Sequence, residues 1–361
     1  MITKRKGNKR IVVGLSGGID STVSLILLKK QGWEPIGVTL KLPAWKDTSW
    51  IAESINIAKK ICKKLKVPYF VVDAQKDFTK KVIGYFISEI KKNKTPNPCI
   101  VCNRDFKFKK LFEMAKKMGA NYVATGHYSR LRELKTKNKK LKTPEYQLLI
   151  AKDKEKDQSY MLSGLLQKDL KRIVLPLGGL TKKEVYKIAK KQGFKFFKKI
   201  RQSQDFCFVS GKSLPAFLKE SIGEKAGDII DENERIIGRH QGSHFFTLGQ
   251  RKGINSAQGP YFVFGFDKKR NIVYVTKNQK KLFKKEIILS PYHLISGKKL
   301  KKSINARVKT RYRQELAPAK IIPKNKNSLR IIFKNPVFCP TPGQFAVFYD
   351  KEKCLGNGVI A

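Results

Sequence analysis

Short apolar runs alternate with longer amphipathic stretches along the first part of the chain. The runs are rich in β-branched residues, which is typical of buried strands, and they lie at residues 11–15, 36–40, 69–72 and 122–124. Between them, apolar positions recur at helical spacing over residues 50–65, 77–90 and 106–118, and Gly119 follows the last stretch. This alternation predicts an α/β fold with a doubly wound, mostly parallel sheet, whose ligands bind at the carboxyl ends of the strands.

The pattern changes after residue 212, where alternating strands and glycine-containing turns replace the helical spacing. Residues 261–278 predict a hairpin around the turn DKKRN, and further strands are predicted at residues 304–313, 328–333 and 345–349. We therefore expect an α/β domain over residues 1–212, a small central domain over 213–283 and an all-β, barrel-like domain over 284–361.

Two local features stand out within the α/β part. Residues 181–192 are predicted to form a helix, because Thr181 and Glu184 can form a capping box at its start and Gly193 follows its end. Residues 132–144, RELKTKNKKLKTP, are predicted to form a basic, turn-rich insertion. Simple solvation is the favoured explanation of its charge.

The loop after the first predicted strand, in the string IVVGLSGGIDST, is suited to bind an anion. Gly17 and Gly18 allow backbone N–H groups to approach a ligand closely, and the following helix adds partial positive charge at its N-terminus. We expect Ser21 and Thr22 to cap that helix and Gly32 to end it. The loop lacks the Gly-Lys-Ser/Thr of a Walker A loop and the pattern Gly-x-Gly-x-x-Gly, and a Gly-Gly pair alone is equally consistent with a plain tight turn.

Length and composition limit the class of protein. The 361 residues, 41% of them hydrophobic, suffice for two or three domains with real cores, and no apolar run reaches the length of a membrane span. The net charge of +50 favours a polyanionic partner such as nucleic acid, but 63 of the 78 basic residues are lysine, and the bias of an AT-rich genome explains most of this excess. Six cysteines are too few for a disulfide scaffold and predict a reduced, cytoplasmic protein.

The stretch KTPNPCIVCNRDFKF, residues 94–108, carries a candidate nucleophile. Its two prolines predict an ordered loop before a helix that begins near Asn103. A thiol at a helix start has a lowered pKa, because the positive end of the helix stabilises the thiolate. The neighbours Arg104 and Lys107 act in the same direction, so we expect a lowered pKa and high reactivity for Cys102.

The pair Cys99-x-x-Cys102 admits three interpretations. Half of a zinc site would need two more ligands at close spacing, and none follows; a thioredoxin-like redox pair expects a different fold. In the third, one cysteine is a nucleophile whose partner lies elsewhere, and Cys207 in RQSQDFCFVSG is a candidate. A buried apolar role between two phenylalanines is the alternative for Cys207. Core or surface roles are expected for the other cysteines, which are Cys62, Cys339 and Cys354.

Other polar residues fall at predicted element ends. His127 in ATGHYSR follows a strand, where a nucleotide would lie, although a structural role is equally consistent. Asp157 and Gln158 in KDQSYML lie at a predicted helix start, where either could be a cap. In the β half, residues 240–254 and 308–314 are basic with interleaved aromatics or amides, which suits RNA contact or a solvated sheet face.

Together these strings resemble the tRNA-specific 2-thiouridylases, a family of PP-loop ATP pyrophosphatases. GLSGGIDS, TPNPCIVCN, ATGHY, KDQSYML, FTLGQRKG, TRYRQ and TPGQFAVFY occur in the family's order with similar spacing, over about residues 10–361. The Lys-rich segment 132–144 is a variable region of the family, and position 99 is Cys where some members carry Asp.

The resemblance implies a reaction and a site. ATP adenylates the C2 oxygen of the wobble uridine of a tRNA, pyrophosphate leaves, and a protein persulfide delivers sulfur to C2. Cys207 would hold the persulfide, Cys102 would be the nucleophile that helps to release its sulfur, and Asp20 would help to hold Mg²⁺ with ATP, with no structural metal. ATP would contact Gly14, Leu15, Ser16, Gly17, Gly18, Ile19, Asp20, Ser21, Leu40 and Gly126. The target base would lie against Asn97, Pro98 and Cys99, and tRNA would contact His127, Lys156, Asp157, Gln158, Arg311, Tyr312 and Gln344.

The resemblance also implies partners. These are the anticodon region of tRNA and a sulfur-relay protein or cysteine desulfurase as donor, with a monomeric enzyme that has no membrane partner. Two other classes of protein stay open: a PP-loop ligase that acts on a small molecule, and a non-catalytic RNA-binding module. The first leaves Cys102, Cys207 and the basic β half without a role, and the intact SGGIDS loop with both thiols is evidence against the second.

Overall fold

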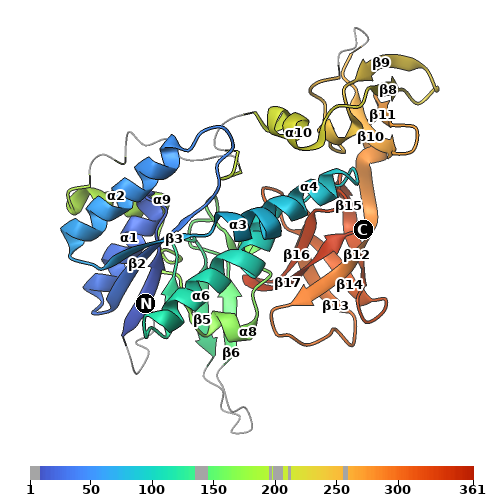
Figure 1. Cartoon of the computed structure of the whole chain (residues 1–361). Coiled ribbons are helices and arrows are strands. Elements are labelled where there is room, and N and C mark those ends of the chain that lie inside the picture. The colour runs from blue at the N-terminus through green and yellow to red at the C-terminus, as the bar shows by residue number, and fades with distance from the viewer. Residues whose placement is uncertain (1–8, 135–144, 195–196, 198–205, 210–212, 255–258) are drawn as a thin grey trace.

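The computed structural model describes residues 9–134, 145–194, 197, 206–209, 213–254 and 259–361 (Figure 1). A helix-flanked sheet forms the N-terminal part of the molecule, a barrel forms the C-terminal part, and a smaller sheet lies beside the barrel. Among the described residues, no helix is long and apolar enough to cross a membrane.

The N-terminal sheet has five parallel strands in the order β3-β2-β1-β4-β7. Its strands are β1 (Arg10–Gly14), β2 (Glu34–Lys41), β3 (Tyr69–Asp73), β4 (Tyr122–Ala124) and β7 (Ile173–Val174). The four predicted strands are thus confirmed. The chain runs outward from β1 to β3 and then returns to β4 on the other side of β1. The strand order therefore reverses between β1 and β4, which is where open α/β sheets bind ligands.

Helices cover both faces of this sheet, as predicted. The side chains of Ile11 and Val13 pack with α1 (Ile19–Lys30), α2 (Ser49–Leu65) and α9 (Lys182–Lys191). Val12, between them, points to the other face and packs with α6 (Phe108–Lys117). Each such buried side chain stabilises the fold by about 1.5–3 kcal/mol. The capping box of Thr181 and Glu184 at the start of α9 is confirmed.

Two helical stretches contain π-helical turns. The first comprises α3 (Gln75–Phe78), η1 (Thr79–Ile83) and α4 (Gly84–Ile90), which confirms the helix predicted over residues 77–90. The second comprises α5 (Pro98–Val101), η2 (Cys102–Lys107) and α6, so this helix begins at Pro98, before the start predicted near Asn103 and before the helical spacing predicted over residues 106–118. Single π-helical turns are frequent at functional sites. The other α-helices among the described residues are α7 (Ser159–Leu162), α8 (Gln167–Leu170) and α10 (Leu214–Ile222).

The central part is a four-stranded sheet in the order β10-β11-β8-β9. Its strands are β8 (Gly227–Ile230), β9 (Ile236–His240), β10 (Phe262–Asp267) and β11 (Ile272–Thr276). The antiparallel pair β10–β11 is the hairpin predicted over residues 261–278.

The C-terminal part is an antiparallel barrel of six strands, closed by the pairing of β12 with β17. Its strands are β12 (Phe283–Leu294), β13 (Ile304–Lys309), β14 (Ala317–Pro323), β15 (Leu329–Phe338), β16 (Phe345–Asp350) and β17 (Lys353–Ile360). Closure leaves no free edge strand in the barrel.

A hairpin of the N-terminal part extends the barrel sheet. It consists of β5 (Arg130–Leu134) and β6 (Glu145–Leu149), and β6 pairs with β17 at Leu149 and Lys353. The loop predicted over residues 132–144 is therefore wrong for its first three residues, which belong to a strand, while residues 135–144 lie outside the described residues.

The segment before α5 is a meeting point of all three parts. Thr95 N–H donates to Pro342 O of the barrel over 2.8 Å, and Asn93 Nδ2 donates to Ser243 Oγ of the central part over 3.1 Å. These contacts hold the cysteine-bearing helix against the barrel and the central sheet.

Candidate active site

The glycine-rich loop after β1 leads directly into α1, which begins at Ile19 with Gly18 as its N-cap. The predicted cap at Ser21 or Thr22 is therefore wrong. Their hydroxyls donate to Gly18 O over 3.0 and 2.9 Å, and Ser21 Oγ accepts from Ser16 N–H over 3.2 Å. These bonds fix the loop, while the first N–H groups of the helix have no partner within the helix and favour an anion.

Two glycines bring backbone close to this loop. Gly17 has φ +72°, and a Cβ there would lie 2.6 Å from Ser54 O of α2. A Cβ on Gly126, after β4, would lie 2.7 Å from Ser21 N in the first turn of α1. The loops after β1 and β4 therefore press together at the point where the strand order reverses, and side chains are excluded there.

Asp20, in the first turn of α1, is held by two side chains from other elements. Lys182 Nζ lies 2.6 and 2.8 Å from its two carboxylate oxygens, and the Lys182 side chain is only 13% exposed. Tyr128 OH donates to Asp20 Oδ1 over 2.7 Å. Burial and the Asp20 charge raise the pKa of Tyr128 far above its ordinary value, so this hydroxyl remains a donor.

Sequence reasoning missed both Tyr128 and Lys182. Lys182 is followed by Lys183, and nothing in the string TKKEV distinguishes the two. The packing of α9 beside α1 decides it, because this packing directs Lys182 to Asp20 and leaves Lys183 exposed. Tyr128 adjoins the singled-out His127 and is itself buried.

The helix that carries Cys102 begins at Pro98 rather than near Asn103. Asn97 Oδ1 caps it, accepting from Cys99 N–H over 3.1 Å and from Ile100 N–H over 3.3 Å. Cys102 consequently lies beyond the first turn, where the π-helical segment η2 starts, and it is 7% exposed. Pro98 is buried, so among the three residues expected at the target base only Cys99 is exposed.

The expectation of a lowered pKa for Cys102 is wrong, because burial outweighs the helix end. The dense surroundings reduce the hydration of all three thiols, which raises the pKa of buried Cys102 above its ordinary value. The same loss of hydration raises the pKa of Cys99 to about 11 and that of Cys207 to about 12, although both of these residues still reach the surface. Lys107 acts against this shift at each of the three thiols. The Arg104 guanidinium is bound to the Asp105 carboxylate over 2.7 and 2.8 Å.

An aromatic cluster joins the segments of Cys102 and Cys207. Phe208 packs against Phe86 and Phe78, with ring centroids 5.5 and 6.2 Å apart, in the cluster that also contains Cys102. Cys207 itself is exposed at the edge of this dense region, so the alternative of a buried apolar residue is wrong. Negative charge on Cys102 or Cys99 further raises the pKa of Cys207, which means that the three thiols are electrostatic neighbours.

The remaining cysteines belong to the cores, as expected: Cys62, Cys339 and Cys354 are buried. All six cysteines are free in this structure. In the described part of the chain, no group of three His, Cys, Asp or Glu side chains gathers to bind a metal ion.

The segment expected to contact tRNA lies beside Tyr128. Gln158 N–H donates to Tyr128 O over 2.7 Å, and Gln158 Oε1 accepts from Tyr128 N–H over 3.0 Å. Lys156 is exposed, and its ammonium carries positive charge at this surface. Lys156 and Gln158 therefore lie where a polyanion can reach them.

Asp157 and His127 face inward instead. Asp157 is 6% exposed and accepts from Ser159 Oγ over 2.7 Å, so it shapes the turn before α7. His127 is half-buried, pairs with Thr125 Oγ1 over 2.7 Å and stacks on Phe108 at 6.0 Å. Burial lowers the pKa of His127 well below its ordinary value, so the ring is neutral.

Two barrel residues that were expected to contact tRNA, Tyr312 and Gln344, lie near α7. The ring of Tyr312 lies 5.8 Å from that of Tyr160 in α7, and Tyr160 OH donates over 2.8 Å to Phe345 O, next to Gln344. Tyr312 and Gln344 are half-buried. The structure thus brings residues 156–158 and the two barrel segments together, although they are far apart in the chain.

Arg311 points into the protein. Its Nη2 donates to Leu248 O of the central part over 3.2 Å and also to the Thr341 hydroxyl. These bonds join the central part to the barrel.

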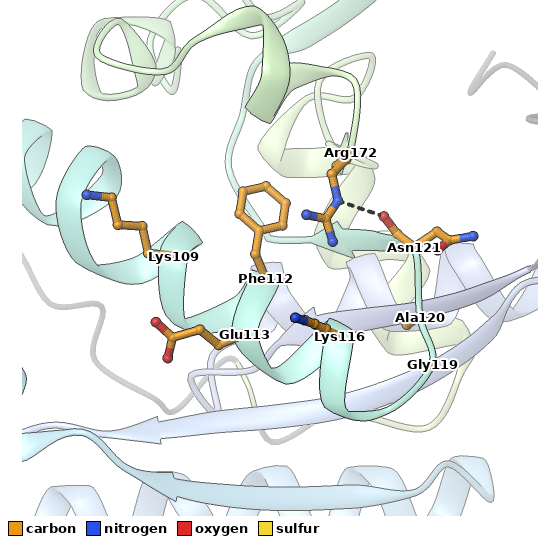
Figure 2. A pocket seen from close by; sticks show the side chains of 8 residues that line it. All are labelled: Lys109, Phe112, Glu113, Lys116, Gly119, Ala120, Asn121 and Arg172. Atoms are coloured by element: carbon orange, nitrogen blue, oxygen red, sulfur yellow. Dashed lines mark hydrogen bonds between the residues drawn. The ribbon is translucent and has the colours of Figure 1, made fainter.

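A shallow hollow of about 630 Å³ lies away from these residues (Figure 2). Arg172 spans it, donating from Nε to Asn121 O over 3.2 Å, with its guanidinium 4.6 Å from the ring of Phe112. Asn121 precedes β4, whereas Gly126 follows it, so the hollow is at the opposite end of the strand from the glycine-rich loop. Its lining consists of Lys109, Phe112, Glu113, Lys116, Gly119, Ala120, Asn121 and Arg172.

Family models match almost the whole chain. They describe a tRNA methyl transferase HUP domain over residues 9–211, a tRNA methyl transferase PRC-barrel domain over 215–277, and an aminomethyltransferase beta-barrel domain over 284–360.

Curated relatives match over nearly their full length. The tRNA-specific 2-thiouridylase MnmA of Staphylococcus epidermidis is 36% identical over 362 residues, which cover 97% of this chain and 95% of the relative. The tRNA-specific 2-thiouridylase MnmA of Listeria monocytogenes is 35% identical over 360 residues, with 97% and 94% covered.

A solved structure, the U34-tRNA thiolase NcsA from Methanococcus maripaludis with its [4Fe-4S] cluster, is more remote. It is 20% identical, covers 60% of this chain and 63% of its own, and has a TM-score of 0.35.

Proposed function

This chain belongs to the tRNA-specific 2-thiouridylase family, and from that premise we propose that it replaces the C2 oxygen of a tRNA uridine with sulfur in a reaction driven by ATP. The observation that carries the proposal is the pair Cys102 and Cys207, whose segments share one aromatic cluster. The glycine-rich loop before α1, which is suited to bind phosphate, lies in the same domain. Activation of the uridine needs the loop, and delivery of sulfur needs the thiols. A domain that holds both supplies the two halves of the reaction.

ATP would bind across the loops after β1 and β4. The start of α1 favours the phosphates, and the Asp20 carboxylate beside them offers an oxygen ligand of the kind that Mg²⁺ accepts together with phosphate oxygens. Mg²⁺, when bound, would offset the charge of the phosphates. The proposed contacts of ATP are Gly14, Leu15, Ser16, Gly17, Gly18, Ile19, Asp20, Ser21, Leu40 and Gly126.

The thiols would transfer sulfur in two steps. Exposed Cys207 takes a sulfane sulfur from a relay protein or a cysteine desulfurase and becomes a persulfide. The Cys102 thiolate then attacks the inner sulfur of this persulfide. The bond to the outer sulfur breaks, a 102–207 disulfide forms, and the released sulfide attacks C2 of the adenylated uridine, from which AMP leaves.

The tRNA would meet the surface where α7, the cysteine helix and the barrel converge. Exposed Lys156 and half-buried Gln158, Tyr312 and Gln344 are suited to direct contact, whereas Asp157, His127 and Arg311 make internal bonds and hold these residues in place. The uridine would leave the anticodon stack and enter beside Cys99. We also propose that the units of this monomer are residues 1–212, 213–283 and 284–361.

The test is a complete reaction of the protein with unmodified tRNA, Mg²⁺–ATP and a cysteine desulfurase with cysteine. Mass spectrometry of the tRNA nucleosides should show 2-thiouridine that depends on ATP, with pyrophosphate released only when tRNA is present. Pyrophosphate release without tRNA would indicate a ligase for a small molecule. Binding of tRNA with no pyrophosphate at all would indicate a non-catalytic RNA-binding module.

A further inference from the structure

Two bonded paths connect Asp20 with the segment at residues 156–158. The first runs through Tyr128, whose hydroxyl donates to Asp20 Oδ1 over 2.7 Å. The backbone of the same tyrosine exchanges two hydrogen bonds with Gln158, of 2.7 and 3.0 Å. Tyr128 is 3% exposed and closely packed, and close-packed interiors transmit displacements. A movement of Gln158 is therefore passed through the tyrosine to its hydroxyl.

The second path runs through Lys182. Its ammonium is bound to both oxygens of Asp20, while its backbone N–H donates to Asp153 Oδ2 over 2.9 Å. Asp153 in turn accepts from Lys156 N–H, at its backbone oxygen over 3.2 Å and at Oδ1 over 3.3 Å. The capping box of Thr181 keeps this end of α9 rigid.

In this arrangement the Asp20 carboxylate is already satisfied by an ammonium and a hydroxyl. A cation that arrives with a nucleotide must displace at least part of this shell. Both members of the shell are bonded to the turn that carries Lys156 and Gln158. Occupancy of that turn is therefore able to change how tightly the carboxylate is held.

We propose that Tyr128 and Lys182 are positioning residues that couple the docking of an RNA at residues 156–158 to the carboxylate of Asp20, so that Mg²⁺–nucleotide binds more tightly when tRNA is present. The inference rests on the proposed function, which assigns tRNA to this segment and Mg²⁺–nucleotide to Asp20. By linkage, the nucleotide must tighten tRNA binding by the same factor.

The experiment is a binding cycle on the full chain. The affinity of Mg²⁺ with the non-hydrolysable analogue α,β-methylene-ATP is measured by calorimetry with and without saturating tRNA. We expect tRNA to tighten analogue binding about tenfold in the natural protein. Tyr128→Phe removes only the hydroxyl and keeps the backbone bonds to Gln158, so it should reduce the factor to about twofold or less. Lys182→Met should do the same, while tRNA affinity without nucleotide stays within about twofold for both variants.

Matched controls exclude a general effect of these changes. Tyr292→Phe removes a hydroxyl that accepts from Leu300 N–H over 3.2 Å in the barrel, and Lys183→Met removes the exposed neighbour of Lys182. Both should retain the tenfold coupling. Thermal melting of each variant identifies any that fail to fold, and Tyr128→Phe, which changes one atom, decides the question if Lys182→Met does not fold.

Two results would overturn the inference: no coupling in the natural protein, or full coupling in folded Tyr128→Phe. Either can occur in a protein that still makes 2-thiouridine, so the proposed function can survive. Conversely, coupling that vanishes in Tyr128→Phe, in a protein that makes no 2-thiouridine, would uphold the inference about binding and reject the proposed reaction.

Discussion

The reactivity of the thiols should rise by about tenfold for each pH unit between pH 7 and pH 9. A thiol with a raised pKa is protonated over this whole range, and below the pKa its thiolate fraction increases tenfold per unit. With a pKa of about 12, about one Cys207 in ten thousand is ionised at pH 8, compared with about a quarter of ordinary thiols. Cys99, with a pKa of about 11, should likewise be almost entirely protonated at pH 8.

Alkylation by iodoacetamide, followed by mass spectrometry of the cysteine peptides at several pH values, measures this directly. Cys99 and Cys207 should both react about a hundredfold or more slowly than an unstructured peptide thiol at pH 8. Buried Cys102 should be the slowest of the three, because the reagent cannot reach it. Rates that do not change between pH 7 and pH 9 would refute the reasoning, since they would mean that the thiols are already ionised.

Substitution of Lys107 tests the same prediction in a second way. It is the cation that opposes the rise in pKa at each thiol, so Lys107→Met should raise all three pKa values further and slow alkylation of Cys99 and Cys207. Lys109→Met is the matched control, because Lys109 is exposed and its ammonium lies 3.5 Å from an Asp105 oxygen. Equal rates in the two variants would exclude the proposed effect of Lys107.

Three further predictions concern the reaction. Cys207→Ser should lose both 2-thiouridine and the sulfane label from the donor, whereas Cys102→Ser should lose 2-thiouridine but keep the label, and Cys99→Ser should remain active. Mass spectrometry of the tRNA nucleosides and of the cysteine peptides measures these outcomes, and a label on Cys99 would contradict the assignment. Asp20→Ala should abolish pyrophosphate release at saturating tRNA while tRNA affinity without nucleotide stays, and full release would remove Asp20 from the mechanism. The affinity for tRNA should fall about a thousandfold between 50 and 200 mM salt if about six phosphates are neutralised, and Lys156→Ala should reduce the salt slope by about one contact; an affinity independent of salt would mean that recognition is by shape.

Features governed by near neighbours in the chain could be predicted from the sequence. The strands of the parallel sheet, the capping box of Thr181 and the hairpin β10–β11 depend on contacts between residues two to four positions apart, or across one turn. The glycine-rich loop was predicted in the same way, and it lies between β1 and α1 as expected. Two of the local predictions that failed are the cap of α1 and the start of the cysteine helix, where Gly18 and Asn97 take the capping position instead of the residues favoured by the sequence pattern. The third is the loop over residues 132–144, whose first three residues belong to β5 because they pair with β6.

Only the tertiary structure decided which residues meet and how their surroundings change their chemistry. The segments of Cys102 and Cys207 come together because phenylalanines from both pack into one cluster, and no periodicity encodes that contact. Lys182 rather than Lys183 reaches Asp20 because α9 packs beside α1. The pKa of Cys102 depends on the balance between a helix end and burial, and burial is a property of the whole fold. A charged group loses its hydration when distant segments close over it, and a sequence read by local pattern contains no measure of that loss.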